Sequence, residues 1–149
     1  MHRALPLIAV VDDEAPIRKA LTRLLNSAGF AVEVFSSGTE FIEFLKTRRP
    51  ACLVLDLHMP LMNGFEVQAR LAETGANIPT VIITGHDSSE TREHALVGRP
   101  AAYLRKPVDD QALLDAIELA LSHNLPAEDA SRKLRDPLHS AQPKPQPKP

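Results

Sequence analysis

The chain has 149 residues, of which 44% are hydrophobic, and a formal net charge of −2. This size and composition are typical of one globular domain with its own core. The nearly balanced charge does not favour nucleic-acid binding through bulk electrostatics. The sequence shows neither a membrane-spanning run nor a secretion signal, and its single cysteine excludes an internal disulfide. We therefore expect a cytoplasmic protein without direct DNA binding or membrane association.

Short apolar runs alternate with segments of helical periodicity from residue 1 to about residue 124. The apolar runs predict strands at 7–11, 30–35, 52–55, 81–83 and 101–104. The spacing of Ile17, Ala20, Leu21, Leu24 and Leu25 predicts a first helix, which ends at Gly29. A second helix begins after Ser36 or Ser37, and three more lie near 64–74, 87–97 and 109–123. Segment 87–97 carries the weakest apolar stripe of these.

Five strands that alternate with five helices predict an α/β fold with a mostly parallel sheet. Right-handed crossovers between parallel strands would place helices on both faces of that sheet. The continuously apolar strands agree with this, because strands covered on both faces lose their alternation. Spacing alone does not order the strands.

The composition changes near residue 125, and we expect a domain at 1–124 followed by a tail at 125–149. The tail is rich in proline and ends in Pro143-Lys144-Pro145-Gln146-Pro147-Lys148-Pro149. Proline disfavours helices and central strands, so the tail is predicted to be disordered or extended. It is either a passive extension or a segment that docks to a proline-binding partner.

Polar groups follow the predicted strands where each one ends. Asp12 and Asp13 follow 7–11, Asp56 follows 52–55, Thr84 follows 81–83 and Lys106 follows 101–104. Because the carboxyl ends of parallel strands share one edge, these side chains are expected to converge.

Three carboxylates at one place repel one another unless a cation is present. Oxygen ligands favour a hard cation such as Mg²⁺, which uses one or two carboxylates and keeps several waters. Asp13 and Asp56 would ligate it directly, the backbone carbonyl of His58 is a plausible third ligand, and Asp12 would hold a metal-bound water. Alternatively, Asp12 and Asp13 only favour the start of the next helix.

Asp56 is the candidate nucleophile, because a carboxylate can accept a phosphoryl group to form an aspartyl phosphate. Such transfer depends on neutralising the phosphoryl oxygens. The metal would cover one oxygen, Lys106 a second, and the Thr84 hydroxyl a third. Taken singly, Thr84 is often just a strand residue and Lys106 an ordinary surface lysine.

Five short motifs complete the set: Asp12-Asp13-Glu14, Leu55-Asp56, Met59-Pro60 with Asn63-Gly64, Thr84-Gly85-His86 and Lys106-Pro107. In these motifs the chain resembles the receiver domain of bacterial two-component response regulators, and within that family the FixJ-like branch. The resemblance covers about residues 5–124. It implies a flavodoxin-like (βα)5 three-layer sandwich with sheet order 2-1-3-4-5. It also implies that Asp56 accepts phosphate from a sensor histidine kinase or a phosphotransfer protein, with Mg²⁺ as cofactor.

The resemblance further implies a switch in which Thr84 moves toward phosphorylated Asp56 and Tyr103 rotates into the vacated space. Plain core packing is the alternative role for Tyr103. His58 and His86 occupy positions that flank the path of the hydrolytic water in this family, so they could tune the phosphate lifetime. One departure is Arg99, which stands where the family usually has glycine, with Gly98 one place early.

No DNA-binding domain follows in this sequence, so we expect a stand-alone receiver that acts through an unidentified downstream protein. Such a chain is not an enzyme beyond assisting its own phosphorylation and dephosphorylation. A Mg²⁺-dependent aspartyl-phosphate hydrolase is an alternative, although His58 replaces the second acid that such hydrolases carry. A phosphorylation-independent binding module is another. Self-association through the 87–123 face is also predicted, and an unchanged monomer in sedimentation with a phosphoryl mimic would contradict it.

Overall fold

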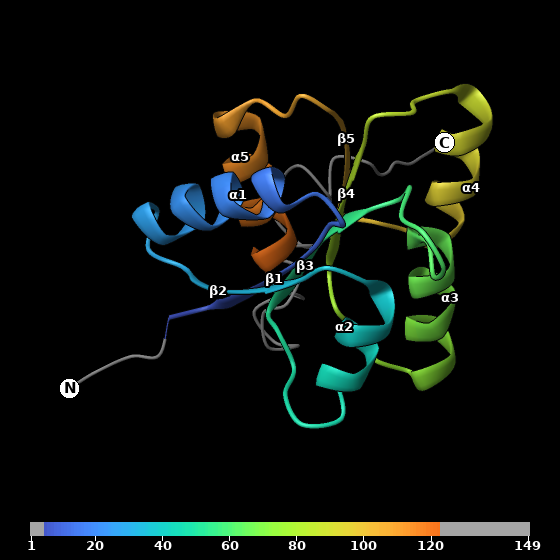
Figure 1. The fold of residues 1–149 in the computed structure, drawn as a ribbon, viewed down its shortest axis with the longest axis horizontal. Helices are drawn as coiled ribbons and strands as arrows, with labels where there is room; N and C mark the ends of the chain where they lie inside the picture. Colours follow the sequence, from blue (N-terminus) through green and yellow to red (C-terminus); the bar gives the residue numbers. More distant parts are fainter. Residues whose placement is uncertain (1–4, 123–149) are drawn as a thin grey trace, which may run out of the picture.

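The computed structural model describes residues 5–122, which form a five-stranded parallel sheet and five helices. The strand order is β2-β1-β3-β4-β5, as predicted (Figure 1). The strands are β1 (Leu7–Val11), β2 (Ala31–Phe35), β3 (Cys52–Asp56), β4 (Thr80–Thr84) and β5 (Ala102–Arg105). The helices are α1 (Ala15–Ser27), α2 (Gly38–Phe44), α3 (Gly64–Thr74), α4 (Ser89–Val97) and α5 (Asp110–Ser122). The predicted boundary at 124 and the tail at 125–149 lie outside the described residues.

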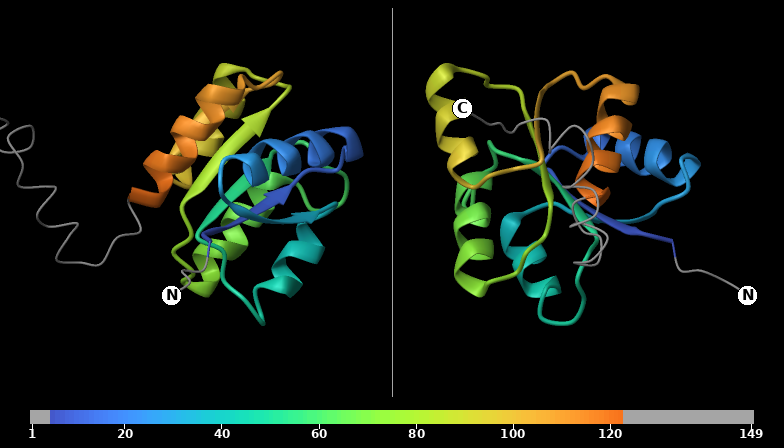
Figure 2. Two further views of the ribbon diagram at one scale, coloured as in Figure 1. Left: turned by 90° about the vertical axis from the view of Figure 1, so that its left-hand side faces the viewer. Right: turned by 180° about the vertical axis from the view of Figure 1, so that it is seen from behind.

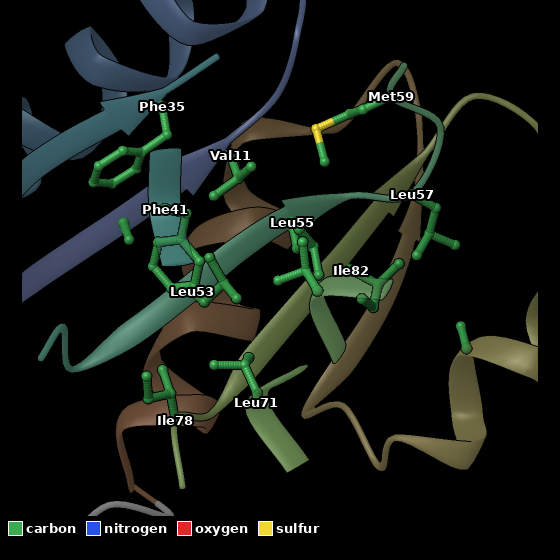
Figure 3. Packing of buried hydrophobic residues seen from close by; sticks show 13 residues of the cluster. Val11, Phe35, Phe41, Leu53, Leu55, Leu57, Met59, Leu71, Ile78 and Ile82 are labelled. Atoms are coloured by element: carbon green, nitrogen blue, oxygen red, sulfur yellow. The ribbon is translucent and has the colours of Figure 1, made fainter. Parts of the chain in front are cut away.

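Helices cover both faces of the sheet and produce three layers. Helices α1 and α5 lie on one face, and α2, α3 and α4 lie on the other (Figure 1, Figure 2). Leu25 and Ile117 belong to the buried cluster under α1 and α5. Phe41 and Leu71 belong to the cluster under α2 and α3 (Figure 3). Every residue of the central strands β1, β3 and β4 is buried, which explains their continuous apolar runs.

The edge strand β2 is less completely buried than the central strands. Glu33 and Val34 are both exposed, Val34 to 40%, whereas Phe35 at the end of the strand is buried. An edge strand has a neighbour on one side only, and the helices reach it less completely. Burial along β2 therefore follows its position in the sheet more than its residue pattern.

Polar caps define where several helices begin. The Ser37 hydroxyl accepts a hydrogen bond from the Glu40 amide, so Ser37 rather than Ser36 caps α2. Asn63 and Glu66 form a reciprocal capping box at the start of α3, next to the site described below. Within residues 5–122, no helix has the length and apolarity that crossing a bilayer requires.

The turn between α4 and β5 contains Arg99, the residue that stands in place of the family's usual glycine. Arg99 adopts a left-handed backbone conformation with φ of 54°, and its side chain is exposed. This conformation costs a residue with a Cβ atom roughly 1–2 kcal/mol, whereas glycine adopts it freely. Position 99 therefore keeps the backbone conformation that favours glycine, and Arg99 is strained in it.

Replacing Arg99 with glycine should stabilise the fold by about 0.5–1 kcal/mol, because relief of backbone strain exceeds the added entropy of the unfolded chain. Gly75 provides a matched control, since its φ is 73° and a Cβ there would meet nothing within 4 Å. Gly75→Ala should destabilise by about 1 kcal/mol. Urea unfolding measures the free energy of unfolding of both variants. If Arg99→Gly and Gly75→Ala change it in the same direction, the backbone strain assigned to Arg99 is contradicted.

Candidate functional site

The carboxyl edge of the sheet collects the polar groups that the sequence placed at strand ends. Asp56 and Thr84 are the last residues of β3 and β4, and Asp12 and Lys106 directly follow β1 and β5. One carboxylate oxygen from each of Asp12, Asp13 and Asp56 lies within 4.8 Å of the others. The predicted convergence is therefore present in the structure.

Lys106 reaches into this acidic cluster. Its Nζ atom lies 2.9 Å from Asp12 Oδ2, 3.2 Å from Glu14 Oε1 and 3.6 Å from Asp56 Oδ2. The Lys106–Pro107 peptide bond is cis, as its position in a tight turn after β5 allows. The contact with Glu14 was not predicted, because the sequence position of an exposed acid at the start of a helix does not indicate its partner.

Asp56 lies in an environment that disfavours its ionised form. Burial is the main cause and the nearby Asp12 charge the second, and together they raise the pKa of Asp56 to about 7. Lys106 and the His58 backbone N–H, which donates to Asp56 Oδ1 at 3.3 Å, act in the opposite direction. One ammonium group does not balance the three carboxylates.

The donor set fits a hard divalent cation. Asp12 Oδ2 is buried, and within residues 5–122 its polar contact is the Lys106 ammonium at 2.9 Å. All the candidate ligands are oxygens, which suits Mg²⁺. The acidic pocket formed by Asp12, Asp13 and Asp56 is therefore compatible with Mg²⁺ binding.

Two histidines lie beside the cluster, where β3 and β4 end. His58 Nδ1 is 3.1 Å from Thr84 Oγ1, and the Thr84 hydroxyl also accepts the backbone N–H of His86 at 3.1 Å. The His58 and His86 rings are 4.4 Å apart between centroids. Burial, His86 and Lys106 lower the pKa of His58 below its ordinary value. The His58–Thr84 contact was missed, because it depends on how β3 and β4 are paired.

Tyr103 is half-buried on β5 and is bound to the segment between β4 and α4. Its hydroxyl donates to Asp87 Oδ1 at 2.8 Å, and Arg92 donates to Asp87 Oδ2 at 2.9 Å. Burial and the Asp87 carboxylate raise the pKa of Tyr103 to about 12. Neither Asp87 nor Arg92 was predicted as a partner of Tyr103, because Tyr103 lies on β5 and the sequence does not show which residues pack against it.

Comparison with known proteins identifies the family. The sequence profile described as "Response regulator receiver domain" matches residues 8–118. The chain belongs to this family. Its fold and its acidic cluster of Asp12, Asp13 and Asp56 are those typical of a receiver domain of two-component systems.

Two curated relatives show the same similarity. The chain is 37% identical over 121 residues to "Transcriptional regulatory protein FixJ" of Rhizobium meliloti, covering 81% of this chain and 59% of that protein. It is 34% identical over 126 residues to "Nodulation protein W" of Bradyrhizobium diazoefficiens, covering 85% of this chain and 56% of that protein. The chain thus spans somewhat more than half the length of these relatives.

Solved structures agree with the sequence comparison. "Crystal structure of FixJ-N" superposes with a TM-score of 0.76 at 35% identity, covering 85% of this chain and 99% of that one. The response regulator StyR superposes with a TM-score of 0.73 at 42% identity, covering 91% of this chain and 68% of that one. The FixJ-like resemblance is therefore confirmed, in sequence and in structure.

The raised pKa of Asp56 predicts a pH-dependent cost to stability in the metal-free protein. Because the folded-state pKa of about 7 exceeds the ordinary value of 3.8, Asp56 contributes most stability below pH 3.8 and progressively less as pH rises to about 7. Asp56→Asn removes the charge and should stabilise the metal-free protein above pH 7 by on the order of 1–3 kcal/mol. Urea unfolding across this pH range measures the difference.

Mg²⁺ is the control for that comparison, because a cation in the pocket relieves the same repulsion. It should raise the melting temperature of the wild-type chain more than that of Asp56→Asn. If the stability advantage of the metal-free Asp56→Asn variant over the wild type grows toward low pH, the assigned environment of Asp56 is contradicted.

Proposed function

We propose that Asp56 is the phosphoacceptor of this receiver and takes its phosphoryl group from a phosphohistidine of a sensor histidine kinase or a phosphotransfer protein. The observation that carries the proposal is the convergence of Asp12, Asp13 and Lys106 on the carboxylate at the end of β3, with Thr84 at the end of the neighbouring strand β4. Such an arrangement neutralises charge where a transferred phosphoryl group would place its oxygens.

The carboxylate of Asp56 attacks phosphorus while the bond from phosphorus to the histidine nitrogen breaks, and the leaving imidazole takes up a proton. Lys106, already 3.6 Å from Asp56 Oδ2, pairs with one phosphoryl oxygen. The Thr84 hydroxyl, on the neighbouring strand, moves to pair with another. Asp13, Asp56 and the His58 carbonyl would hold Mg²⁺, and Asp12 would help to bind the hydrated ion. When bound, the metal supplies positive charge to a third oxygen.

A switch follows from the movement of Thr84. As its hydroxyl turns toward phosphorylated Asp56, Tyr103 rotates into the space that Thr84 leaves. The pairing of β4 with β5 supports this coupling, because Thr84 lies opposite Arg105, two residues beyond Tyr103. The rotation changes the face formed by α4, β5 and α5, which an unidentified downstream protein reads.

The two alternative functions have less support from the site. In an aspartyl-phosphate hydrolase a second acid two residues after the nucleophile would protonate the leaving group. Here that residue is His58, and its ring is engaged with Thr84 at 3.1 Å. A binding module that is never phosphorylated would have no use for three mutually repelling carboxylates, of which Asp12 and Asp56 are buried.

Incubation with acetyl phosphate and Mg²⁺ should give a heat-labile shifted band on a phosphate-affinity gel. Asp56→Asn and EDTA should each abolish the band, because one removes the acceptor and the other the cation. Asp115→Asn is the matched control, since Asp115 is exposed on α5 and, among residues 5–122, is bonded only to Gln111. A phosphorylated histidine kinase serves as a second donor, and failure with both donors would contradict the proposal.

We also propose that His58 and His86 tune the lifetime of the aspartyl phosphate. The support is their position beside the Thr84 hydroxyl, with the two rings 4.4 Å apart. His58→Leu removes the imidazole and leaves the backbone carbonyl, so the phosphate half-life should lengthen roughly severalfold if the ring assists the attacking water. Decay of phosphorylated protein on the same gel measures this.

His94→Gln is the control for this series, because the His94 ring stacks on Phe65 with 3.9 Å between centroids and is not among the hydrogen-bond partners of the Thr84 hydroxyl within residues 5–122. His58→Asn keeps a polar atom near the Nδ1 position and should behave more like the wild type than His58→Leu. Equal half-lives for all these variants would exclude the tuning role.

A further inference from the structure

The single tyrosine of the chain is bonded to a carboxylate that the receiver motif does not include. Asp87 Oδ1 accepts the Tyr103 hydroxyl at 2.8 Å, and Asp87 Oδ2 accepts from Arg92 at 2.9 Å. The Arg92 guanidinium carbon also lies 5.4 Å from the centroid of the Tyr103 ring. Arg105 Nη1 is 3.9 Å from Asp87 Oδ2. The phenol is thus fixed at its hydroxyl and at its ring.

Asp87 belongs to the short segment that joins Thr84 to α4. It follows Thr84, the last residue of β4, and precedes Ser89, the first residue of α4. The Asp87 side chain is only 15% exposed, so the hydrogen bond with Tyr103 is partly shielded from water. The Thr84 hydroxyl accepts the His86 N–H at 3.1 Å within this same segment. A displacement of Thr84 would therefore be transmitted to Asp87.

We propose that Asp87 is a positioning residue that holds Tyr103 in its unphosphorylated position and so opposes the switch. The inference rests on the proposed function, since it concerns the rotation of Tyr103 that follows movement of Thr84. In the unphosphorylated chain the charge-assisted hydrogen bond favours the arrangement seen here. When Thr84 moves toward phosphorylated Asp56, the segment carries Asp87 away and the bond breaks.

Two arginines make this release feasible. After Tyr103 leaves, Asp87 keeps Arg92 and Arg105 as cationic partners, so its charge does not become unpaired. Tyr103 loses its 2.8 Å hydrogen bond to a carboxylate. Asp87 therefore sets how strongly the switched arrangement is disfavoured before phosphorylation, without touching the phosphoryl group.

The apparent affinity for beryllofluoride in the presence of Mg²⁺ tests the proposal, because this phosphoryl mimic favours the switched arrangement. Binding is measured from the ¹⁹F NMR signal of bound beryllofluoride. Removing one hydrogen bond that stabilises only the unswitched state should raise the apparent affinity roughly three- to tenfold. We expect this for Tyr103→Phe, which removes the hydroxyl and keeps the ring. We expect a smaller increase for Asp87→Asn, whose amide oxygen still accepts from the phenol but no longer carries the charge that strengthens the bond.

The double variant separates the hydrogen bond from other effects. If both substitutions act on the same bond, Asp87→Asn has nothing left to weaken once the hydroxyl is gone, and the double variant should bind no more tightly than Tyr103→Phe alone. Asp115→Asn is the matched control, because it makes the same chemical change at an exposed aspartate on α5. Its affinity should equal that of the wild type.

Fluorescence gives a second readout that a merely structural role would not move. The chain has one tyrosine and no tryptophan, so its emission reports on Tyr103 alone. A phenol bonded to a carboxylate is quenched, and emission should rise in Asp87→Asn and, in the wild type, on addition of beryllofluoride with Mg²⁺. Asp115→Asn should emit like the unliganded wild type.

The results separate the role of Asp87 from the proposed function. Unchanged or weaker binding by Asp87→Asn, or additive effects in the double variant, would overturn the role of Asp87 while the proposed function stands. A wild-type chain that binds no beryllofluoride would overturn the proposed function and this inference together. If Asp87→Asn does not fold, Tyr103→Phe alone carries the test, and unchanged affinity in that variant overturns the proposal.

Discussion

The accumulation of negative charge at one edge of the sheet is the constraint on which the rest of the structure depends. Parallel strands bring Asp12, Asp13 and Asp56 within 4.8 Å at their carboxylate oxygens, and Lys106 is the ammonium group that reaches them. Burial of Asp12 and Asp56 strengthens the repulsion between them, because water screens these two charges poorly, whereas Asp13 is exposed. A cation or a phosphoryl group bound here changes the electrostatic energy of these groups more than it changes the packing of the side chains around them. The fold therefore concentrates its response to phosphorylation at this edge.

In the proposed switch, a local change at the site would be transmitted outward through the neighbouring elements. Thr84 ends β4, and the segment after it leads through Asp87 into α4, whose only buried residue is Ala95. A helix with so little buried surface is easily displaced. Tyr103 connects the same segment to β5. Exposed apolar side chains at Leu96 and Val97 lie on this side of the molecule, where self-association stays a prediction.

Much of the fold and of the site followed from sequence because both depend on simple geometry. Continuous apolar runs identified buried parallel strands, and the common edge of such strands placed Asp56 and Lys106 together. Side-chain contacts across strands were not predictable, since the His58–Thr84 and Asp87–Tyr103 contacts depend on register and rotamer. Val34 is exposed because β2 lies at the edge of the sheet, and the spacing of residues alone does not show which strand is at the edge.

The central claim is that Asp56, and not another acid of the cluster, carries the phosphoryl group. Borohydride reduces an aspartyl phosphate to homoserine, and mass spectrometry of the digested protein locates the altered residue. After phosphorylation with Mg²⁺ we expect homoserine at position 56, with Asp12 and Asp13 unchanged. Homoserine at position 12 or 13, or phosphate retained on His58, would contradict the claim.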